Sequence, residues 1–391
     1  MAPAMISLAR AASRLATTAA ARGSGLAAPL GAAPGLSARR HLQSSAEPTK
    51  TLKVGIIGAG RIGQVHAQTL AYRCPSAEPL MIVDYFPEVA KSTAAEYGIP
   101  ESGSDYMDVV NHPDIQAVWV CSPSSLHAEQ IIASAKAGKH IFCEKPLATE
   151  LAEVDDVMKV VEDCGVKMML AFQRRFDPNF ARLRQAIVDG VVGDPFTFRL
   201  TSRDPAPPPL AYLAHSGGLF RDMMIHDFDV ARWLLDDTVV SVQAIGSVLV
   251  DAEIGAAGDI DTATVMMRTA RGRHCTICCS RRASYGYDQR IEVHGSQGSA
   301  SATNHHLARI EVATVDGFTR PPLLDFFMSR YARAYAAGMA AFVAAVRGDA
   351  PVTTDGTDGL AALVLADAAV RSMASGRAVD PAESIEPGRP S

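Results

Sequence analysis

Short apolar runs alternate with longer segments of helical periodicity between residues 51 and 172. The apolar runs occupy residues 53–57, 80–83, 117–121, 140–143 and 167–171. The helical segments occupy residues 64–72, 88–97, 126–137 and 150–164. Strands that alternate with helices need crossover connections, which are right-handed and build a parallel sheet. The pattern therefore predicts an α/β Rossmann domain with a doubly wound parallel sheet over residues 51–172.

The pattern changes after about residue 175. A helix over 179–188 and a strand over 195–202 precede a proline-rich loop and a helical segment, 217–235. Strands then follow one another at 242–250, 261–268, 274–280, 289–294, 299–303 and 309–315, before helices at 331–347 and 356–375. Consecutive strands form antiparallel sheets. We expect an α+β substrate-binding and oligomerisation domain at 173–380, with a large, open, mostly antiparallel sheet, and a polar tail at 381–391.

The open sheet of this second domain has consequences for assembly. The predicted helices suffice to cover one of its faces, and a sheet face that is left uncovered is a common place for subunit contact. The sequence therefore predicts a homo-oligomer, a dimer or a tetramer, joined through the open face.

Residues 1–46 differ in composition from the rest of the chain. They are rich in Ala, Ser and Leu and contain five arginines but no acidic residue. This composition is typical of a cleaved organelle transit peptide and not of a secretory signal. Because arginine predominates, we expect import into the mitochondrial matrix, with a plastid or the cytoplasm as the less favoured location.

Charge and cysteine content exclude several classes of protein. The formal net charge is −5, so no basic excess indicates binding to nucleic acid. Beyond the first segment, no uncharged apolar run is long enough to span a membrane. The seven cysteines lie mostly in apolar runs. Cys275, Cys278 and Cys279 lack a second ligand pair at metal-binding spacing, so we expect neither a metal site nor a disulfide framework.

The segment Gly58-Ala59-Gly60-Arg61-Ile62-Gly63 joins the first predicted strand to the first predicted helix. In this setting a G-x-G-x-x-G turn presents a helix N-terminus to a dinucleotide pyrophosphate. Asp84 ends the second strand, where its carboxylate accepts from ribose hydroxyls and repels a 2′-phosphate, so we expect NAD and not NADP. The further candidate cofactor-binding residues follow the later strands: Ser122, Pro123, His127, Glu144 and Lys145.

Two motifs indicate catalytic chemistry. Lys145, in the tripeptide Glu-Lys-Pro, follows the fourth predicted strand and so lies at the edge of the sheet that faces the cofactor. In the stretch GGLFRDMMIHDFDVARWLL, Asp222 and His226 stand four residues apart and are expected on one helix face. A carboxylate beside an imidazole fixes its tautomer, as a general acid or base requires. Asp229 is expected to pair with Arg232 in a structural contact.

Taken together, residues 53 to about 379 resemble the glucose–fructose oxidoreductase, inositol dehydrogenase and rhizopine-catabolism (Gfo/Idh/MocA) oxidoreductases. The resemblance rests on GIIGAGRIGQVHA, CEKPLA, AFQRRFDPNF, GGLFRDMMIHDFDVARWL and RYARAYAAGMAAFVAAV. Within this family, TSRDPAPPP followed by the 217–235 segment is most similar to inositol 2-dehydrogenases. The resemblance implies that Lys145, Asp222 and His226 are the catalytic groups and that the protein is a tetramer.

These observations predict an NAD-dependent dehydrogenase that oxidises a secondary hydroxyl of a myo-inositol-like cyclic polyol to a ketone. His226, oriented by Asp222, is the preferred base, with Lys145 as the alternative. The candidate substrate-binding residues are Lys145, Arg174 (or Arg175), Arg203, Asp204, Asp222, His226 and Tyr331. An aldose or another sugar or cyclic alcohol is the alternative substrate. A non-catalytic NAD-binding sensor is the alternative of another class, because a fold alone does not establish an activity.

Overall fold

The computed structural model describes residues 51–148 and 151–384. Its first sheet has six parallel strands in the order β3-β2-β1-β4-β5-β6. The strands are β1 (Leu52–Ile57), β2 (Ala77–Val83), β3 (Glu101–Gly103), β4 (Ala117–Val120), β5 (His140–Cys143) and β6 (Met168–Leu170). This is the strand order of a Rossmann fold, and it confirms the predicted doubly wound sheet.

The helices of this first part are α2 (Arg61–Arg73), α3 (Pro87–Tyr97), α4 (Tyr106–Asn111), α5 (His127–Lys136) and α6 (Leu151–Cys164), with a 3₁₀ turn, η1 (Ser124–Leu126). Strand β3 and helix α4 have no counterpart in the sequence prediction. Strand β3 is a partly exposed edge strand of three residues, so it carries no apolar run. Helix α4 is short, and its N-cap is Asp105, whose side chain accepts from the Met107 N–H.

The second sheet has six strands in the order β12-β11-β7-β10-β9-β8. They are β7 (Pro195–Arg203), β8 (Val239–Ser247), β9 (Thr262–Thr269), β10 (His274–Ser280), β11 (Asp288–Gly295) and β12 (Gly298–Ala302). The central pair β7 and β10 is parallel, and the other pairs are antiparallel. The sheet is therefore mostly antiparallel, as predicted, with one parallel pair at its centre. The two strands of that pair are far apart in the chain.

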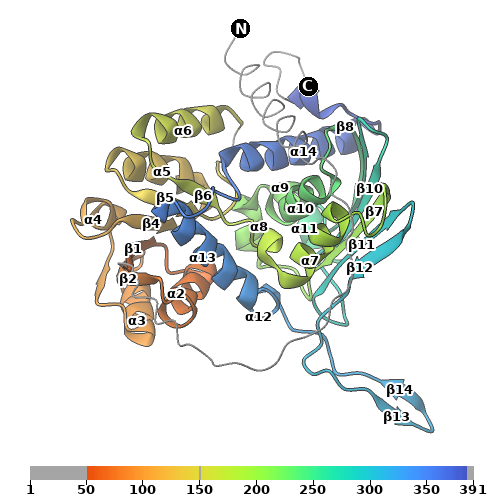
Figure 1. Ribbon diagram of the computed structural model, residues 1–391, viewed down its shortest axis with the longest axis horizontal. Coiled ribbons are helices and arrows are strands. Elements are labelled where there is room, and N and C mark those ends of the chain that lie inside the picture. Colours follow the sequence, from red (N-terminus) through yellow and green to blue (C-terminus); the bar gives the residue numbers. More distant parts are fainter. Residues whose placement is uncertain (1–50, 149–150, 385–391) are drawn as a thin grey trace, which may run out of the picture. The chain divides into compact units, whose positions relative to one another are not determined.

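Helices cover one face of this second sheet (Figure 1). Helix α10 (Ile225–Leu235) packs on β7, and α14 (Gly356–Ser375) packs on β8 and on α10. The inward side chains of β9 and β10, such as Val265 and Ile277, are fully buried, whereas Met266 and Ile245 on the other face are at least half exposed. The other elements here are α7 (Pro178–Val188), α8 (Leu210–Ser216), α9 (Gly218–Asp222), α11 (Ala252–Ala256), η2 (Gln173–Phe176) and η3 (Pro381–Ser384).

One late helix packs with the first sheet and not with the second. Helix α13 (Ala332–Arg347), which follows α12 (Phe327–Arg330), contacts α2. Its Phe342 ring lies edge-on to Trp119 of β4, with the ring centroids 5.2 Å apart, and is also close to Phe142 of β5. Residues 51–384 fall within one compact unit, and the division at residues 172 and 173 stays a prediction.

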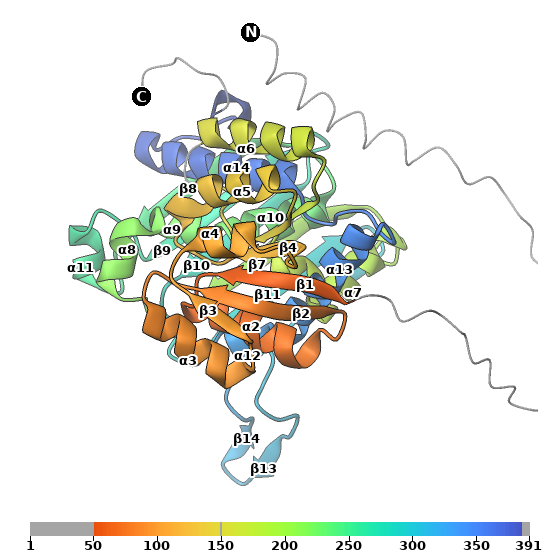
Figure 2. The same cartoon turned by 90° about the vertical axis from the view of Figure 1, so that its left-hand side faces the viewer.

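The strand expected at 309–315 is not part of the second sheet. Residues Val312–Thr314 form β13, which pairs only with β14 (Gly317–Thr319) in a separate hairpin. The hairpin stands away from the rest of residues 51–384 in both views (Figures 1 and 2). Its apolar side chains, among them Val315 and Phe318, are exposed. The apolar pattern predicts a strand over 309–315, of which residues 312–314 form one, but the pattern does not indicate which strand it pairs with.

None of the helices in the described residues is long and apolar enough to cross a membrane. Five of the cysteines are buried, Cys278 is half-buried and Cys164 is exposed. Between residues 51 and 384, apart from 149–150, no group of three or more His, Cys, Asp or Glu side chains could hold a metal ion.

Candidate active site

The glycine-rich turn has the geometry that a dinucleotide requires. Gly58 has φ +98°, and a Cβ there would lie 2.6 Å from the Cys121 carbonyl oxygen. A Cβ on Gly63 would lie 1.9 Å from the Gly58 carbonyl oxygen, so α2 could not pack against the turn. Around Gly60, by contrast, a Cβ would meet nothing within 4 Å. The turn is thus closed toward the protein and open at the N-terminus of α2, where a pyrophosphate binds.

Asp84 stands beside this turn at the end of β2. Its Oδ2 accepts a hydrogen bond of 2.7 Å from the Ala59 N–H, and its Oδ1 accepts one of 2.9 Å from the Phe86 N–H. The carboxylate is half-buried, and it follows β2 at the sheet edge that carries the glycine-rich turn. Asp84 therefore has a fixed position from which it can contact a ribose. Arg61 and Ile62 begin α2 directly after Gly60.

Ser122 and Pro123 follow β4, and at least part of each residue reaches solvent. His127, in contrast, is buried, and its two ring nitrogens lie 2.7 Å from the Pro146 carbonyl oxygen and 3.0 Å from the Ser122 carbonyl oxygen. This placement differs from the predicted direct contact between His127 and the cofactor. The ring lies between the segment after β4 and the segment after β5, and it holds both segments in place through their backbone oxygens.

Lys145 reaches from the end of β5 to the second sheet's helices. Its Nζ donates to the backbone oxygen of Asp222 at 2.6 Å and approaches Asp222 Oδ1 at 3.3 Å. Both side chains are mostly buried, with 15% of Lys145 and 11% of Asp222 exposed. The structure therefore brings together two of the three predicted catalytic residues. Glu144 does not point to solvent: its Oε1 lies 2.6 Å from His66 Nε2.

The expected continuous helix at 217–235 is two helices. Helix α9 ends at Asp222, and α10 begins at Ile225, with Met223 and Met224 between them. The spacing of four residues therefore does not stack Asp222 on His226, and no hydrogen bond joins them in the described residues. Asp222 instead accepts from the Tyr212 hydroxyl at 2.7 Å, and its Oδ2 lies 3.5 Å from Arg281. The prediction that Asp222 orients His226 has no support in this geometry.

His226 is the third predicted catalytic residue, and it follows α9 by one turn. Its Nδ1 is buried and has no hydrogen-bond partner within residues 51–148 and 151–384. Burial lowers the pKa of His226 well below its ordinary value, and the charges of Lys145 and Arg174 lower it further. The imidazole is therefore neutral near pH 7 and can accept a proton. The Phe172 ring stands edge-on to it, with the centroids 6.4 Å apart.

The arginines of the AFQRRF segment bind carboxylates behind the site. Arg174 is buried and pairs with Asp227 and with the Ser202 hydroxyl. Arg174 is close enough to act on the charge of His226, but it has no free donor at the surface for a substrate. The partner of Asp229 is Arg175, not Arg232 as expected: Arg175 Nε donates to Asp229 Oδ2 at 3.0 Å.

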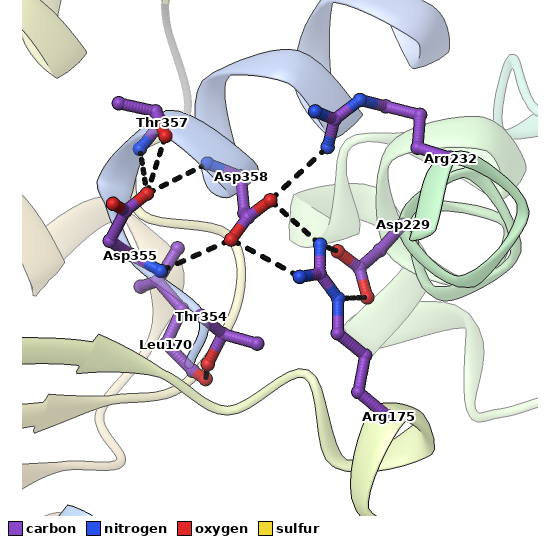
Figure 3. A network of polar contacts seen from close by, with 8 residues as sticks. All are labelled: Leu170, Arg175, Asp229, Arg232, Thr354, Asp355, Thr357 and Asp358. Carbon is purple, nitrogen blue, oxygen red and sulfur yellow. Dashed lines mark hydrogen bonds and ion pairs between the residues drawn. The ribbon is translucent and has the colours of Figure 1, made fainter. Parts of the chain in front are cut away.

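Figure 3 shows how this contact extends to helix α14. Arg175 also donates to Asp358 at 2.7 Å, and Arg232 approaches the same carboxylate at 3.3 Å. Burial works to raise the pKa of Asp358, but Arg175 and Arg232 hold it below its ordinary value. Asp358 belongs to the capping box of α14 with Asp355. The network fastens α10, α14 and the segment after β6 to one another.

The remaining candidate substrate-binding residues have different surroundings. Asp204 is close enough to Asp222 that burial and the Asp222 charge raise the pKa of Asp204 to about 7. Arg203, its neighbour on β7, donates to the Tyr285 hydroxyl at 2.7 Å on the uncovered face of the sheet, away from Arg174. Tyr331 is completely buried, with its hydroxyl 3.5 Å from Gln289. The structure therefore retains Asp204 as a candidate and gives Arg203 and Tyr331 structural contacts.

Sequence reasoning missed three residues that touch Asp222 or Glu144, the neighbour of Lys145. These are His66, Tyr212 and Arg281. Arg281 is almost completely buried and also donates to Asp259 at 3.1 Å. His66 lies in the motif GRIGQVHA, whereas Tyr212 lies between the proline-rich loop and the 217–235 segment. No local pattern marks Arg281, which reaches Asp222 from the end of β10.

Family models match most of the described chain. One, described as an oxidoreductase family with an NAD-binding Rossmann fold, matches residues 52–172. The other, the GFO/IDH/MocA C-terminal domain, matches residues 180–301.

Individual relatives agree with these matches. An inositol 2-dehydrogenase of Rhizobium meliloti is 49% identical over 84% of this chain and 99% of its own length. A myo-inositol 2-dehydrogenase of Thermotoga maritima is 42% identical over 85% of this chain and 100% of its own length. The structure of scyllo-inositol dehydrogenase from Lactobacillus casei, with bound NAD(H) and scyllo-inositol, is similar with a TM-score of 0.79. It is 31% identical and is matched over 85% of this chain and 100% of that one.

These relatives correct one prediction. They are bacterial proteins, and bacteria have no mitochondrial matrix, so the predicted transit peptide and mitochondrial location are wrong. The prediction depended on the composition of residues 1–46 alone, and those residues lie outside the part of the chain that the structure describes. Segments rich in Ala and Arg also occur in proteins that are not imported into an organelle, so composition alone does not identify a transit peptide.

Proposed function

This chain belongs to the Gfo/Idh/MocA oxidoreductase family, and we propose that Lys145, Asp222 and His226 carry out its reaction. The chain is an NAD-dependent dehydrogenase that oxidises a secondary hydroxyl of a cyclic polyol of the inositol type to a ketone. The observation that supports the residue roles best is the contact of Lys145 with Asp222 at 2.6 and 3.3 Å, with a neutral His226 one turn further on.

The reaction removes a proton from the hydroxyl and a hydride from the carbon that bears it. Burial and two neighbouring cations keep the imidazole of His226 neutral, so its lone pair is available to accept the proton. Lys145 donates a hydrogen bond to the oxygen on which negative charge develops. Asp222 holds the Lys145 ammonium in place and is itself held by Tyr212 and Arg281. NAD supplies the hydride acceptor when it is bound.

The residues present fit a bound NAD. Gly58, Gly60 and Gly63 form the phosphate turn, and its open side at Gly60 leaves room for the pyrophosphate. Asp84 is proposed to bind the adenosine ribose, where its negative charge would disfavour a 2′-phosphate. Ser122, Pro123 and the backbone at Glu144 and Lys145 border the nicotinamide half at the carboxyl ends of β4 and β5.

The first experiment is a measurement of NADH formation by the full chain. The substrates are myo- and scyllo-inositol, a set of aldoses and simple cyclic alcohols, each with NAD and with NADP. We expect turnover of an inositol with NAD. Turnover of aldoses alone would keep the chemistry and change the substrate class. Binding of NAD without turnover of any substrate would contradict the enzymatic proposal and favour the sensor.

We also propose that the protein forms a homo-oligomer whose subunits meet at the uncovered face of the second sheet. Met266 and Ile245 are 50% and 66% exposed there, although a large apolar side chain on a sheet normally packs against another layer. A homo-oligomer joined through this face would bury both. Light scattering after size-exclusion chromatography should show a smaller particle for Met266→Arg, and no change for Val188→Arg, which lies at the end of α7. An unchanged mass for Met266→Arg would argue against this interface.

A further inference from the structure

His66 is a buried polar residue that neither the cofactor turn nor the predicted catalytic group uses. It lies on α2, three residues after Gly63, and is fully buried. The rings of Phe142 and Tyr335 stand edge-on to it, each with its centroid 5.6 Å from that of the imidazole. An apolar residue would fill this space at a lower desolvation cost, so the imidazole needs another explanation.

The hydrogen bonding of the ring fixes its tautomer. His66 Nε2 lies 2.6 Å from Glu144 Oε1, whereas Nδ1 is buried and has no partner among the described residues. A proton on Nδ1 would leave a buried donor unsatisfied and would set the Nε2 lone pair against a carboxylate oxygen. Nε2 therefore carries a proton and donates a hydrogen bond to Glu144.

The other oxygen of Glu144 faces the catalytic lysine. Glu144 Oε2 lies 3.3 Å from the backbone N–H of Lys145, and Glu144 is 7% exposed. The backbone of Lys145 is thus held at the residue whose Nζ reaches Asp222. A short buried path runs from α2, through Glu144, to the Lys145 backbone. Its first member lies in the helix whose N-terminus receives the cofactor pyrophosphate.

We propose that His66 is a positioning residue for Lys145. By donating to Glu144, it fixes the carboxylate that holds the Lys145 backbone, and so it sets where the Lys145 ammonium meets the substrate oxygen. The inference rests on the role proposed above for Lys145. A misplacement of a catalytic group by about 1 Å reduces turnover by up to about 100-fold, so a loss of this contact is large enough to measure.

Two substitutions separate the hydrogen bond from the packing. His66→Phe keeps a planar ring between Phe142 and Tyr335 but removes the donor. His66→Gln keeps an amide N–H at the reach of Nε2. We expect His66→Phe to lower kcat by about 10- to 100-fold while the Kd of NAD changes by less than about twofold, and His66→Gln to recover most of the loss. A kcat within twofold of the natural chain for the Phe variant, or equal losses in both variants, would overturn the proposal.

Two further measurements test the inference by other means: the first does not depend on the folding of His66→Phe, and the second does not depend on polyol activity. Glu144→Gln weakens the same contact, so this variant alone should lower kcat, and a kcat within twofold of the natural chain would overturn the inference. Its effect should not add to that of His66→Phe, because both act on one interaction. Independent effects that multiply would count against the path. Hydrogen exchange of the Lys145 amide, followed by mass spectrometry on the NAD-bound chain, needs no substrate. It should speed up in the Phe variant and stay slow in the Gln variant, and unchanged exchange in the Phe variant would overturn the inference.

Discussion

The carboxylates around α9 and α10 fall into two groups with different partners. Asp227 and Asp229 are fully buried, and each faces an arginine; Arg175 binds Asp229 through two nitrogens, at 3.0 and 2.5 Å. Asp222 is partly exposed, its Lys145 contact to Oδ1 is 3.3 Å and its Arg281 contact is 3.5 Å. All three aspartates come from one short stretch of sequence.

The difference separates a structural pair from a catalytic group. A bidentate arginine saturates a carboxylate and fixes it, which suits a contact that joins helices. Lys145 directs two of the three donors of its ammonium to Asp222, so one donor remains for a substrate oxygen. His226 also has a polar atom that no carboxylate holds, because its buried Nδ1 has no hydrogen-bond partner in the described residues. The bidentate arginine distinguishes Asp229 from Asp222, whereas Arg174 holds Asp227 through one oxygen, and Asp227 Oδ2 has no partner among the described residues.

The strongest test of this comparison is His226→Ala. Loss of the base should lower kcat by about two to four orders of magnitude, while NAD binding and the unfolding midpoint stay close to those of the natural chain. Steady-state kinetics, NAD titration and thermal unfolding measure the three quantities. An active variant would show that Lys145, and not His226, accepts the proton.

The reverse result is expected for the structural pair. Arg175→Met keeps most of the side chain's length but leaves Asp229 buried and unpaired, so the free energy of unfolding should fall by about 3–5 kcal/mol. The matched control is Arg232→Met, because Arg232 is 31% exposed and makes one contact of 3.3 Å to Asp358. The free energy of unfolding of Arg232→Met should fall by less than about 1 kcal/mol. Equal losses in urea unfolding would show that Arg175 is not the centre of the network.

Asp204 should make the free energy of unfolding depend on pH. Its pKa is raised to about 7, so between pH 4 and 7 the folded protein holds a proton on Asp204 that the unfolded chain releases. Stability from this group is therefore present at low pH and is lost as the pH rises, by at most about 1.4 kcal/mol per pH unit. Asp204→Asn should flatten the stability profile between pH 4 and 7. A parallel profile for the variant would mean that Asp204 ionises normally.

The smallest effect concerns the cofactor. Asp84→Ala should raise the ratio of NADP to NAD utilisation by about tenfold, because a charged acceptor near the ribose is removed. Asp84→Asn is the informative partner, since an amide oxygen can still accept from a turn N–H while the charge is gone. If the Asn variant keeps the full preference for NAD, the charge of Asp84 is not what selects the cofactor.

The sequence predicted the first sheet and the glycine-rich turn well, because both depend on local patterns. Apolar runs mark the buried parallel strands, and the glycines mark backbone positions that admit no side chain. It did not predict that the helix breaks at Met223 and Met224, because the apolar periodicity continues across the break. It did not predict that Asp229 pairs with Arg175, because that partner lies more than 50 positions away. Buried hydrogen-bond partners such as Arg281 leave no periodic signal at all. Composition alone also proved a poor guide to location.

The packing of α13 on the first sheet has a consequence for synthesis on the ribosome. Trp119 and Phe142 emerge early, but the ring that covers them, Phe342, belongs to one of the last helices to be translated. Thr354, later still, donates its hydroxyl to the Leu170 carbonyl oxygen at the end of β6. The nascent chain must therefore keep an unfinished, partly exposed nucleotide-binding sheet until the C-terminal helices leave the exit tunnel. A chain released before residue 332 lacks the layer that closes its N-terminal half.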